Sequence, residues 1–528
     1  MQAPAMTPQQ HPRSGPPPGP PPGPPAALTP RIAAALTGVL ISAMMSGLNS
    51  RLGGLALADV RGGLGLGIDE ASWLNVCYAA GELMVMPFAT WFSITLTVRR
   101  FYLIALWTTA GIGLVTPFVI NLPVLLVLRT VQGVSAGALI PILMMMALRF
   151  LPMAIRLHGL ALYALTATFA PNIAIWIAGF WTDSVALPNG LWWQFLPAAV
   201  ICTGLVGWGL PKEPVHWPRF ATLNWPALIT GAPGLFMIAL GIGQGNRLDW
   251  FNAPLVSFCL LAGGLCLLAY GAFEWSHPAP FIRLQLLARR NLQIGFSAFV
   301  VILTIFYSGA GLPAGLLAQT QGYRPLQSAP LGLIIGLPQL LFGSLVALLL
   351  YRKWIDARKV FASGLLCVGT ACFLAAGLDA TWTWQQFIPM QILQAIGQPM
   401  TVVSMLFLST SVVQPMEGPF VAGLVNTLRA FATLLGVALI GHFEELRAEG
   451  HSMHLVERWG MVRNLLPHPP GAAEAASLIN EQAAVLAVAD AYRLLGALAF
   501  LLVPYAALFR FIPAPTLPSP PSAEPVKS

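Results

Sequence analysis

The sequence predicts an all-α integral membrane protein with fourteen transmembrane helices, arranged as two six-helix bundles with two helices inserted between them. Three observations support this prediction. The chain is 56% hydrophobic and only 9% charged, whereas a soluble domain usually carries about 25% charged residues. Apolar stretches of roughly 17–25 residues, long enough to cross a bilayer, recur along its whole length. A motif in the fourth stretch also returns in the twelfth, which is typical of transporters built from two related halves.

The apolar stretches divide the chain into its expected parts. They lie at 32–57, 72–95, 101–120, 123–148, 157–181, 193–211, 225–245, 253–274, 292–318, 328–350, 359–378, 386–410, 418–441 and 491–512. The first six form the N-terminal bundle, residues 31–211, and the last six form the C-terminal bundle, residues 275–512. The seventh and eighth form the insert, residues 225–274.

Four segments are expected outside the membrane. Residues 1–30, which contain "PPPGPPPGPP", and residues 513–528 are predicted to be disordered cytoplasmic tails. Residues 212–224 form a cytoplasmic linker broken by prolines. Residues 442–490 form the one long external loop, which is expected to be solvated, with a docking surface for an external partner as the alternative. Its alanine-rich part, 472–489, is compatible with a helix that extends the last span.

The orientation follows from the basic residues. With the N-terminus in the cytoplasm, the short loops on that side collect most of the basic residues, namely Arg99, Arg100, Arg149, Arg156, Lys212, Arg219, Arg283, Arg289, Arg290, Arg352, Lys353, Arg358 and Lys359. The opposite short loops hold little more than Arg61, Arg247 and Arg324. This asymmetry obeys the positive-inside rule, and an even number of spans returns the C-terminus to the cytoplasm. The net charge of +8 therefore reports topology and requires no nucleic-acid partner.

The two halves share a motif. "LRTVQGVSAGALIP" in the fourth span aligns with "MQILQAIGQPMTVV" in the twelfth when Gln132 is set on Gln394. The period is eight spans, which six helices plus the two inserted ones explain simply. Because the two spans run in the same direction, this is a parallel repeat, as in transporters whose halves face each other across a central path.

Charges inside the spans are few and suggest function, because each costs roughly 2.5–3.5 kcal/mol at the centre of a membrane helix. Glu82 in the second span, Arg129 in the fourth and Arg429 in the thirteenth are clear cases, and Arg51 lies toward the outer end of the first. At 1.5 Å per residue, Glu82, Arg129 and Arg51 are expected in the outer half of one bundle. We predict that Glu82, flanked by Arg129 and Arg51, binds the coupling proton. The alternatives are a static brace between helices and a position of Arg51 in the headgroup region.

Other polar side chains are candidates for lining a substrate path, although each can instead form a hydrogen bond between helices. The predicted path residues are Asn49, Asn75, Gln132, Asn172, Gln394, Asn426 and Arg429, and further candidates are Gln244, Gln339, Gln391 and Gln398. Gly133 and Gly137 follow Arg129 at the spacing of close helix contacts. Together with Pro171, which kinks its helix, and Gly179, they are candidates for conformational roles. The six cysteines all lie within predicted spans, and neither a metal site nor a cofactor is expected.

Several motifs resemble one family. "LRTVQGVSAGALIP" resembles the span-four motif of the major facilitator superfamily, and "LVNTLRAFATLLGVAL" resembles an Asn-x-x-Arg signature of its fourteen-helix QacA/EmrB drug:proton antiporters. "GNRLDWF", "PFIRLQLLARRNLQIG" and "ASWLNVCYAAGELMVMPFATWF" are similar to further stretches of that family. The resemblance covers residues 32–512 and implies the major facilitator fold, with alternating access of two halves.

The chain also departs from the family pattern. The acidic residue of the family's first span falls on Asn49, so we expect Glu82 to take its role. The loop "TWFSITLTVRR" keeps only the basic end of the usual motif, at Arg99 and Arg100. In "APNIAIWIAGF", Ala174 and Ile175 stand where the family has Gly-Pro.

The resulting interpretation is a proton-coupled exporter of small amphipathic or aromatic compounds, with a bias toward organic anions, in the inner membrane of a bacterium. The resemblance further implies a periplasmic adaptor and an outer-membrane channel as partners, besides the lipid bilayer, the substrate and protons. The alternatives are an importer, an uncoupled facilitator, and a non-transporting sensor or assembly subunit. An enzyme is not expected, because paired carboxylates or histidine clusters at a span end are absent from the pattern.

Overall fold

A computed structural model describes residues 29–55, 59, 61–62, 65–152, 155–187, 190–463 and 470–514. In these ranges thirteen helices are long and apolar enough to cross a membrane. A further helix, α3 (Ile68–Thr95), has 28 residues and carries Asp69, Glu70 and Glu82, which lower its hydropathy. It brings the number of long helices in the described part of the chain to fourteen, in agreement with the sequence prediction.

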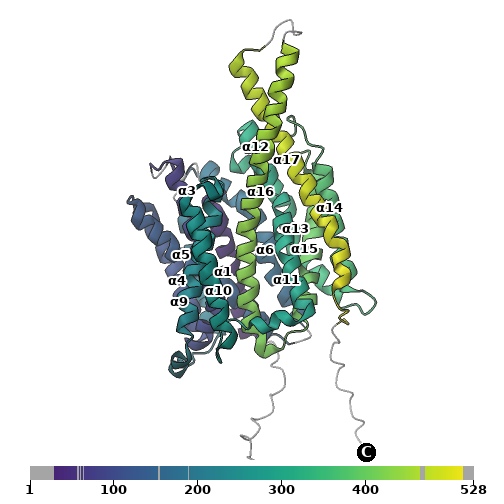
Figure 1. The fold of residues 1–528 in the computed structure, drawn as a ribbon. Helices are drawn as coiled ribbons and strands as arrows, with labels where there is room; N and C mark the ends of the chain where they lie inside the picture. The colour runs from purple at the N-terminus through teal and green to yellow at the C-terminus, as the bar shows by residue number, and fades with distance from the viewer. Residues whose placement is uncertain are drawn as a thin grey trace, which may run out of the picture.

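The N-terminal half is a bundle of six spans (Figure 1). Its helices are α1 (Pro30–Leu55), α3, α4 (Val98–Val115), α5 (Leu122–Phe150), α6 (Arg156–Gly179) and α8 (Phe195–Gly209), with the short α7 (Gly190–Trp193) before α8. α5 begins after Asn121, whose side chain accepts a hydrogen bond from the backbone N–H of Val124, and Pro123 occupies the first turn, where proline is tolerated. From Gln132 to Leu148 nearly every residue of α5 is buried, which makes α5 the central helix of this bundle.

The C-terminal half repeats this arrangement. Its helices are α11 (Arg290–Ile305), α12 (Gly311–Gln321), α13 (Pro325–Leu350), α14 (Ala357–Ala375), α15 (Ile388–Thr410), α16 (Gly418–Val462) and α17 (Ala472–Tyr505). α11 and α12 form one span that is broken at the 3-10 turn η6 (Phe306–Ser308). α14 begins after Asp356, whose carboxylate accepts a hydrogen bond from the N–H of Arg358.

The two inserted helices, α9 (Trp225–Gly245) and α10 (Pro254–Ser276), lie against the N-terminal half. Leu235 and Ala239 of α9 pack on Leu83 of α3. Near the other end of α3, the ring of Phe88 meets the ring of Tyr270 on α10 edge-on, with centroids 5.9 Å apart. The insert therefore covers α3 from outside. α9 also reaches α16 of the C-terminal half, because Phe431 and Leu434 pack against the same cluster.

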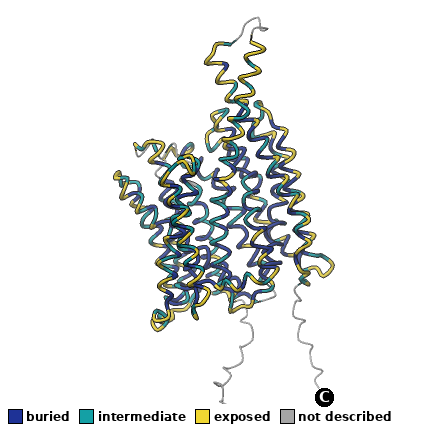
Figure 2. Tube along the Cα trace, in the orientation of Figure 1, coloured by how far each residue is buried: buried dark blue, intermediate teal, exposed yellow. Residues whose placement is uncertain are grey.

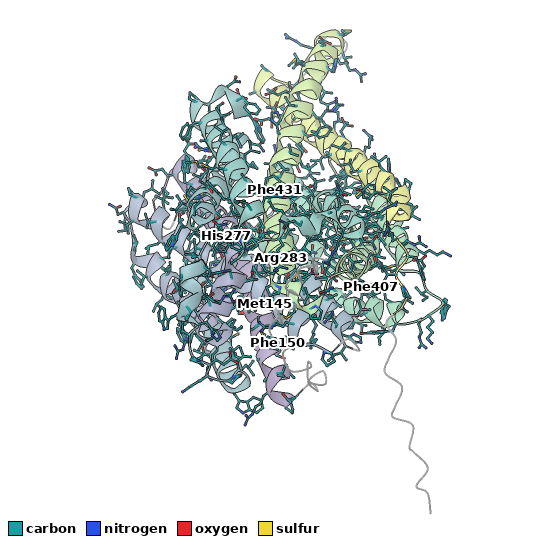
Figure 3. The ribbon with its side chains drawn as sticks, turned by 60° about the horizontal axis from the view of Figure 1, so that its bottom comes forward. Met145, Phe150, His277, Arg283, Phe407 and Phe431 are labelled. Atoms are coloured by element: carbon teal, nitrogen blue, oxygen red, sulfur yellow. The ribbon has the colours of Figure 1, made fainter. Side chains whose placement is uncertain are left out.

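The two halves meet along α6 and α13. Gly332 of α13 lies so close to α6 that a Cβ atom there would be 2.0 Å from the carbonyl oxygen of Asn172. At the outer end, Arg324 forms ion pairs with Asp183 and Asp59, at 2.7 and 3.0 Å. α3 and α5 contact α16 closer to the end of the bundle that carries the basic loops. Figure 3 turns this end toward the viewer, and Phe150, Arg283 and Phe407 are labelled in it.

The external loop expected at 442–490 is largely a helical hairpin. α16 has 45 residues, about 67 Å of helix, and continues well past a hydrocarbon core of about 30 Å. It projects beside α17 at the top of Figure 1, and Figure 2 shows the exposed residues that cover the projection. The helix expected over 472–489 is present as the first half of α17. Residues 442–462, expected as loop, instead continue α16, because the two helices cover each other and remain paired outside the membrane.

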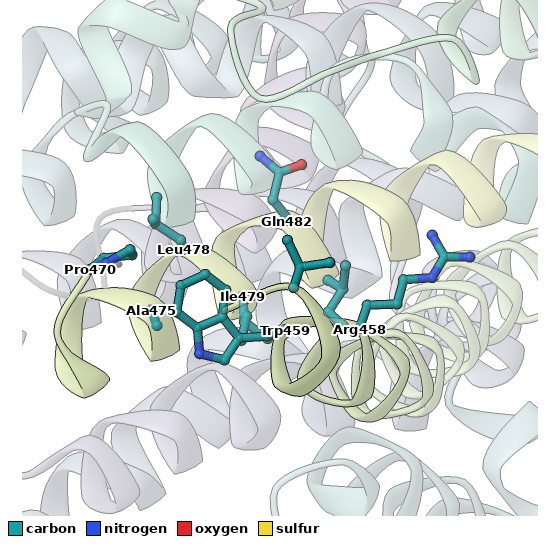
Figure 4. Close-up of a pocket in the computed structure, with 9 residues that line it drawn as sticks. Arg458, Trp459, Pro470, Ala475, Leu478, Ile479 and Gln482 are labelled. Atoms are coloured by element: carbon teal, nitrogen blue, oxygen red, sulfur yellow. The ribbon is translucent and has the colours of Figure 1, made fainter. Parts of the chain in front are cut away.

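The hairpin contains a pocket of about 260 Å³ between its two helices (Figure 4). Trp459 from α16 and Leu478 and Ile479 from α17 are among the apolar residues that line it. At the base of the hairpin, Asp490 of α17 pairs with Arg447 and His451 of α16. This pairing fixes the two helices relative to each other outside the bilayer.

Candidate functional site

Glu82 is buried inside the N-terminal half. Its side chain is 7% exposed and its carboxylate accepts a hydrogen bond of 2.8 Å from the hydroxyl of Ser50 on α1. The charges of Arg429 and Arg51 act on it. The ion pairs formed by the described residues do not include Glu82. The carboxylate is thus near two guanidinium groups without being tied to either.

Arg129, the expected neighbour of Glu82, lies in a different layer. It is 1% exposed, and its guanidinium lies over the rings of Tyr78 and Trp192, 4.5 Å from each centroid. It donates hydrogen bonds to the side-chain oxygen of Gln132 at 2.7 Å and to the carbonyl of Leu74 at 3.4 Å. Leu74, Tyr78 and Glu82 are successive turns of α3. Arg129 therefore sits about one turn, or 5.4 Å, further out than Glu82.

Tyr78 connects these two layers. Its hydroxyl accepts a hydrogen bond of 3.2 Å from the amide of Asn49 on α1, and both Glu82 and Arg129 act on it electrostatically. Asn49 is thus part of the Arg129 layer, and so is Gln132, whose amide also donates to the carbonyl of Thr109 on α4. The charged groups predicted to form one cluster are arranged as two stacked layers with a phenol between them.

Close packing of α3 on α5 holds both layers in place. A Cβ atom at Gly133 would lie 2.1 Å from the carbonyl oxygen of Tyr78, and one at Gly137 would lie 2.7 Å from that of Glu82. The absence of a side chain at these positions lets the backbones touch. Gly179 allows an equally close approach across the two halves, because its Cβ would lie 2.4 Å from the nitrogen of Leu326. Pro171 lies inside α6, one residue before Asn172.

A second polar region crosses the boundary between the two halves. From α16, Arg429 donates to the hydroxyl of Thr166 at 2.7 Å, and Asn426 accepts from the hydroxyl of Tyr163 at 2.9 Å. Both partners are on α6. One to two turns further along α6, Asn172 donates to the side-chain oxygen of Gln398 on α15 at 3.3 Å. These three hydrogen bonds join the halves inside the membrane.

Gln394 extends this region into the C-terminal half. Its side-chain oxygen accepts from Gln398 at 3.2 Å, and its amide donates to Ser308 at 2.9 Å. The buried side-chain oxygens of Gln339 and Gln391 have no hydrogen-bond partner in the described part of the chain. Unpaired buried acceptors of this kind are suited to a polar ligand or to water. Asn75, by contrast, is half buried beside Gly54, near the start of α3, and is not part of either region.

Sequence reasoning missed several partners of the predicted residues. Ser50, Tyr78, Trp192, Tyr163 and Thr166 carry no intramembrane charge, and only their tertiary contacts distinguish them from other apolar-helix residues. Ser50 had a weak signal, because it lies in the polar triplet "NSR" at 49–51. Arg429 was assigned to the path alone, whereas the structure also places its charge near Glu82.

We expect Arg129→Lys to destabilise the protein by about 2–3 kcal/mol, because the ammonium cannot lie flat between two aromatic rings while donating to Gln132. Loss of intrinsic tryptophan fluorescence on heating in detergent would measure this. Arg100→Lys is the matched control, since Arg100 is exposed at the end of the bundle. Equal unfolding temperatures for the two variants would show that the stacking contributes nothing.

Residues 39–437, most of the membrane part, match the Major Facilitator Superfamily. The chain belongs to this superfamily. It is 28% identical over 359 residues to the "Probable multidrug resistance protein EmrY" of Escherichia coli strain K12, a match that spans 65% of this chain and 64% of that protein. It is 24% identical over 460 residues to the "Fatty acid resistance protein FarB" of Neisseria gonorrhoeae, covering 82% of this chain and 84% of that protein. The QacA/EmrB resemblance seen in the sequence is thus confirmed.

The same fold occurs among solved structures of the superfamily. The human organic anion transporter MFSD10 superposes with a TM-score of 0.53 at 15% identity, over 89% of this chain and all of that one. This agreement confirms the expected architecture of two six-helix halves. This member of the superfamily is therefore a multi-pass membrane protein.

Proposed function

We propose that this major facilitator protein exports small amphipathic and aromatic compounds in exchange with protons, and that it prefers organic anions. The observation that carries the proposal is the position of Glu82, a buried carboxyl group of the N-terminal half on which Arg429 of the C-terminal half acts. The multidrug and fatty-acid resistance proteins among its relatives support the same class of activity.

Proton binding at Glu82 changes the force between the halves. An ionised Glu82 attracts Arg429, which is itself anchored to α6 through Thr166. A protonated Glu82 leaves Arg51 and Arg429 facing each other without compensation, and like charges in a low-dielectric interior repel strongly. The charge state of one carboxyl group thereby alters the contact between the halves, which is what coupling to alternating access requires.

The preference for anions follows from the sum of the charges. Around the polar region, guanidinium groups outnumber carboxyl groups. The guanidinium groups are those of Arg51, Arg129 and Arg429, and the carboxyl group is that of Glu82. A lipophilic cation would meet two unbalanced guanidinium groups, whereas a sulfonate or carboxylate would pair with them. FarB, named for fatty-acid resistance, is consistent with an amphipathic carboxylate as substrate.

Inverted membrane vesicles test both parts of the proposal. With an acidic interior, vesicles that contain the protein should accumulate 8-anilino-1-naphthalenesulfonate, and an uncoupler that dissipates the pH gradient should stop this accumulation. Ethidium serves as the cationic comparison and should accumulate less. Accumulation of ethidium without the sulfonate would overturn the anion preference. Sulfonate uptake driven by the opposite gradient would instead identify an importer.

We further propose an inner-membrane location in a bacterium, cytoplasmic termini, and a periplasmic adaptor that connects the transporter to an outer-membrane channel. The hairpin formed by the outer parts of α16 and α17 supports the adaptor, because it projects beyond the membrane and carries an apolar pocket (Figure 4). The basic residues gathered at the opposite end of the bundle support the orientation. Labelling of cysteines introduced at Glu457 and Arg100 with an impermeant reagent in intact cells would test it, with only the Glu457 site expected to react.

A further inference from the structure

We propose that Glu444 is a second proton-binding group of the transport cycle, located at the outer end of the C-terminal half and coupled through Tyr307 to Arg51 and Glu82. This inference rests on the proposed proton-coupled transport. It concerns a residue that the sequence pattern placed in a solvated loop among six other acidic residues. The structure instead places it inside the continuous helix α16, on the side that faces the bundle.

One oxygen of the Glu444 carboxyl group is enclosed. Oε1 is buried and has no hydrogen-bond partner in the described part of the chain, although the residue as a whole is only partly buried. A carboxylate oxygen without a donor in such a place is costly. A surface brace would satisfy both oxygens, and Glu417 provides an example through its paired hydrogen bonds from Arg289. Glu444 is therefore better suited to gain and lose a proton than to hold a fixed partner.

The groups around Glu444 come from three other elements. Tyr307 is in η6, at the break between α11 and α12, and Tyr492 is on α17; the carboxyl group acts on both phenols. Cys372 of α14 lies next to Tyr492. Arg447 and His451 on its own helix are engaged with Asp490, and so is Arg493 on α17. Arg447, His451 and Arg493 are thus committed to Asp490, and the ring of His442 lies beside that of Trp250, 5.6 Å between centroids. The ion pairs of the described residues do not include Glu444.

Tyr307 connects this outer carboxyl group to the central one. Its ring packs against Gly311, where a Cβ atom would lie 2.7 Å from the ring, so α12 fixes its position. Arg51 of the N-terminal half acts on its phenol, and Glu82 in turn acts on Arg51. A phenol can both donate and accept a hydrogen bond. The sequence of groups from Glu444 through Tyr307 and Arg51 to Glu82 therefore crosses from one half to the other.

Distance along α16 places the two carboxyl groups at different depths. Glu444 follows Arg429 by fifteen residues, about 22 Å along the helix, on the side where the hairpin leaves the membrane. A proton arriving from outside would meet Glu444 before it meets Glu82. Its charge would then act through Tyr307 on the arginine that stands beside Glu82.

The test compares Glu444→Gln with Glu445→Gln in the full-length protein reconstituted in liposomes. Both substitutions remove one carboxyl group from neighbouring positions, but Glu445 is exposed. With 8-anilino-1-naphthalenesulfonate as the probe, we expect Glu444→Gln to lower pH-gradient-driven uptake about tenfold. The rates are compared at the pH at which the wild type transports at half its maximal rate. A tenfold change corresponds to a shift of about one pH unit in the protonation equilibrium. Glu445→Gln should behave as the wild type. Tyr307→Phe, which keeps the ring, should shift the pH profile in the same direction as Glu444→Gln.

A second measurement does not depend on transport. Infrared difference spectra recorded between acidic and neutral pH should contain a carboxylic C=O band that is missing in Glu444→Gln and present in Glu445→Gln. Identical spectra and identical pH profiles for the two variants would overturn the inference. If instead the wild type showed no gradient-driven uptake while the Glu444 band was present, the proposed transport function would fail and the proton-binding group would stand.

Discussion

Glu82→Gln should remove pH-gradient-driven transport, with a residual rate below about one hundredth of the wild type, the scale on which loss of a proton-transferring group acts in enzymes. Glutamine keeps the size of the side chain and can still accept the hydrogen bond from Ser50, but it cannot ionise. The attraction toward Arg429 is then absent in every state. The measurement is sulfonate uptake into proteoliposomes at a fixed pH difference.

Two further variants make this result specific. Glu213→Gln, in the exposed linker, removes a carboxyl group away from the membrane part and should have no effect. Ser50→Ala removes the hydrogen bond to Glu82 and keeps the carboxyl group, so it should shift the pH dependence and leave transport in place. If Glu82→Gln transported at a rate near that of the wild type, Glu82 would be a brace between α1 and α3.

Gly332→Ala should be the most damaging small substitution at the boundary of the two halves. The added methyl group would lie 2.0 Å from the carbonyl oxygen of Asn172, so α6 and α13 must separate by about 1.4 Å to reach an ordinary contact of 3.4 Å. That movement would break the hydrogen bond from Asn172 to Gln398. We expect a lower unfolding temperature and a loss of transport of at least about tenfold, because rigidly packed interiors do not absorb such overlaps.

Gly315→Ala is the matched control for this prediction. Gly315 is also inside a helix of the C-terminal half, but a Cβ atom there would meet nothing within 4 Å. Because alanine favours helix over glycine by about 1 kcal/mol, this variant should unfold at the same or a higher temperature. A similar loss in both variants would mean that backbone flexibility, and not the contact between α6 and α13, is what the glycines provide.

The positions of the spans were largely predictable. The seventh span was expected at 225–245 and α9 is Trp225–Gly245; other boundaries moved by a few residues, as for α13, which begins at Pro325 instead of residue 328. Hydropathy succeeds here because a backbone in lipid must satisfy its own hydrogen bonds as a helix. The same reasoning failed at 442–462, where the helix continues in water and is stabilised by α17.

The charged site was predictable in membership but not in arrangement. Glu82, Arg129, Arg51 and Arg429 were found because charges inside apolar spans are conspicuous. Which of them lie close together was not predictable. The depth of a residue counted along its helix does not give the direction in which its side chain points. Arg129 thus faces Tyr78 and Trp192. The charge that acts on Glu82 from the other half belongs to Arg429.

The amino-acid sequence by itself determined the membrane class, the fourteen helices, the two related halves and the superfamily, since each depends on local hydropathy or on short motifs. Only the tertiary structure decided which buried groups share a layer and that Glu444 turns toward the bundle instead of toward solvent. The physical reason is that electrostatic interaction between buried groups depends on distance and surroundings, and both are set by helix rotation and by close contacts such as those at Gly133 and Gly332.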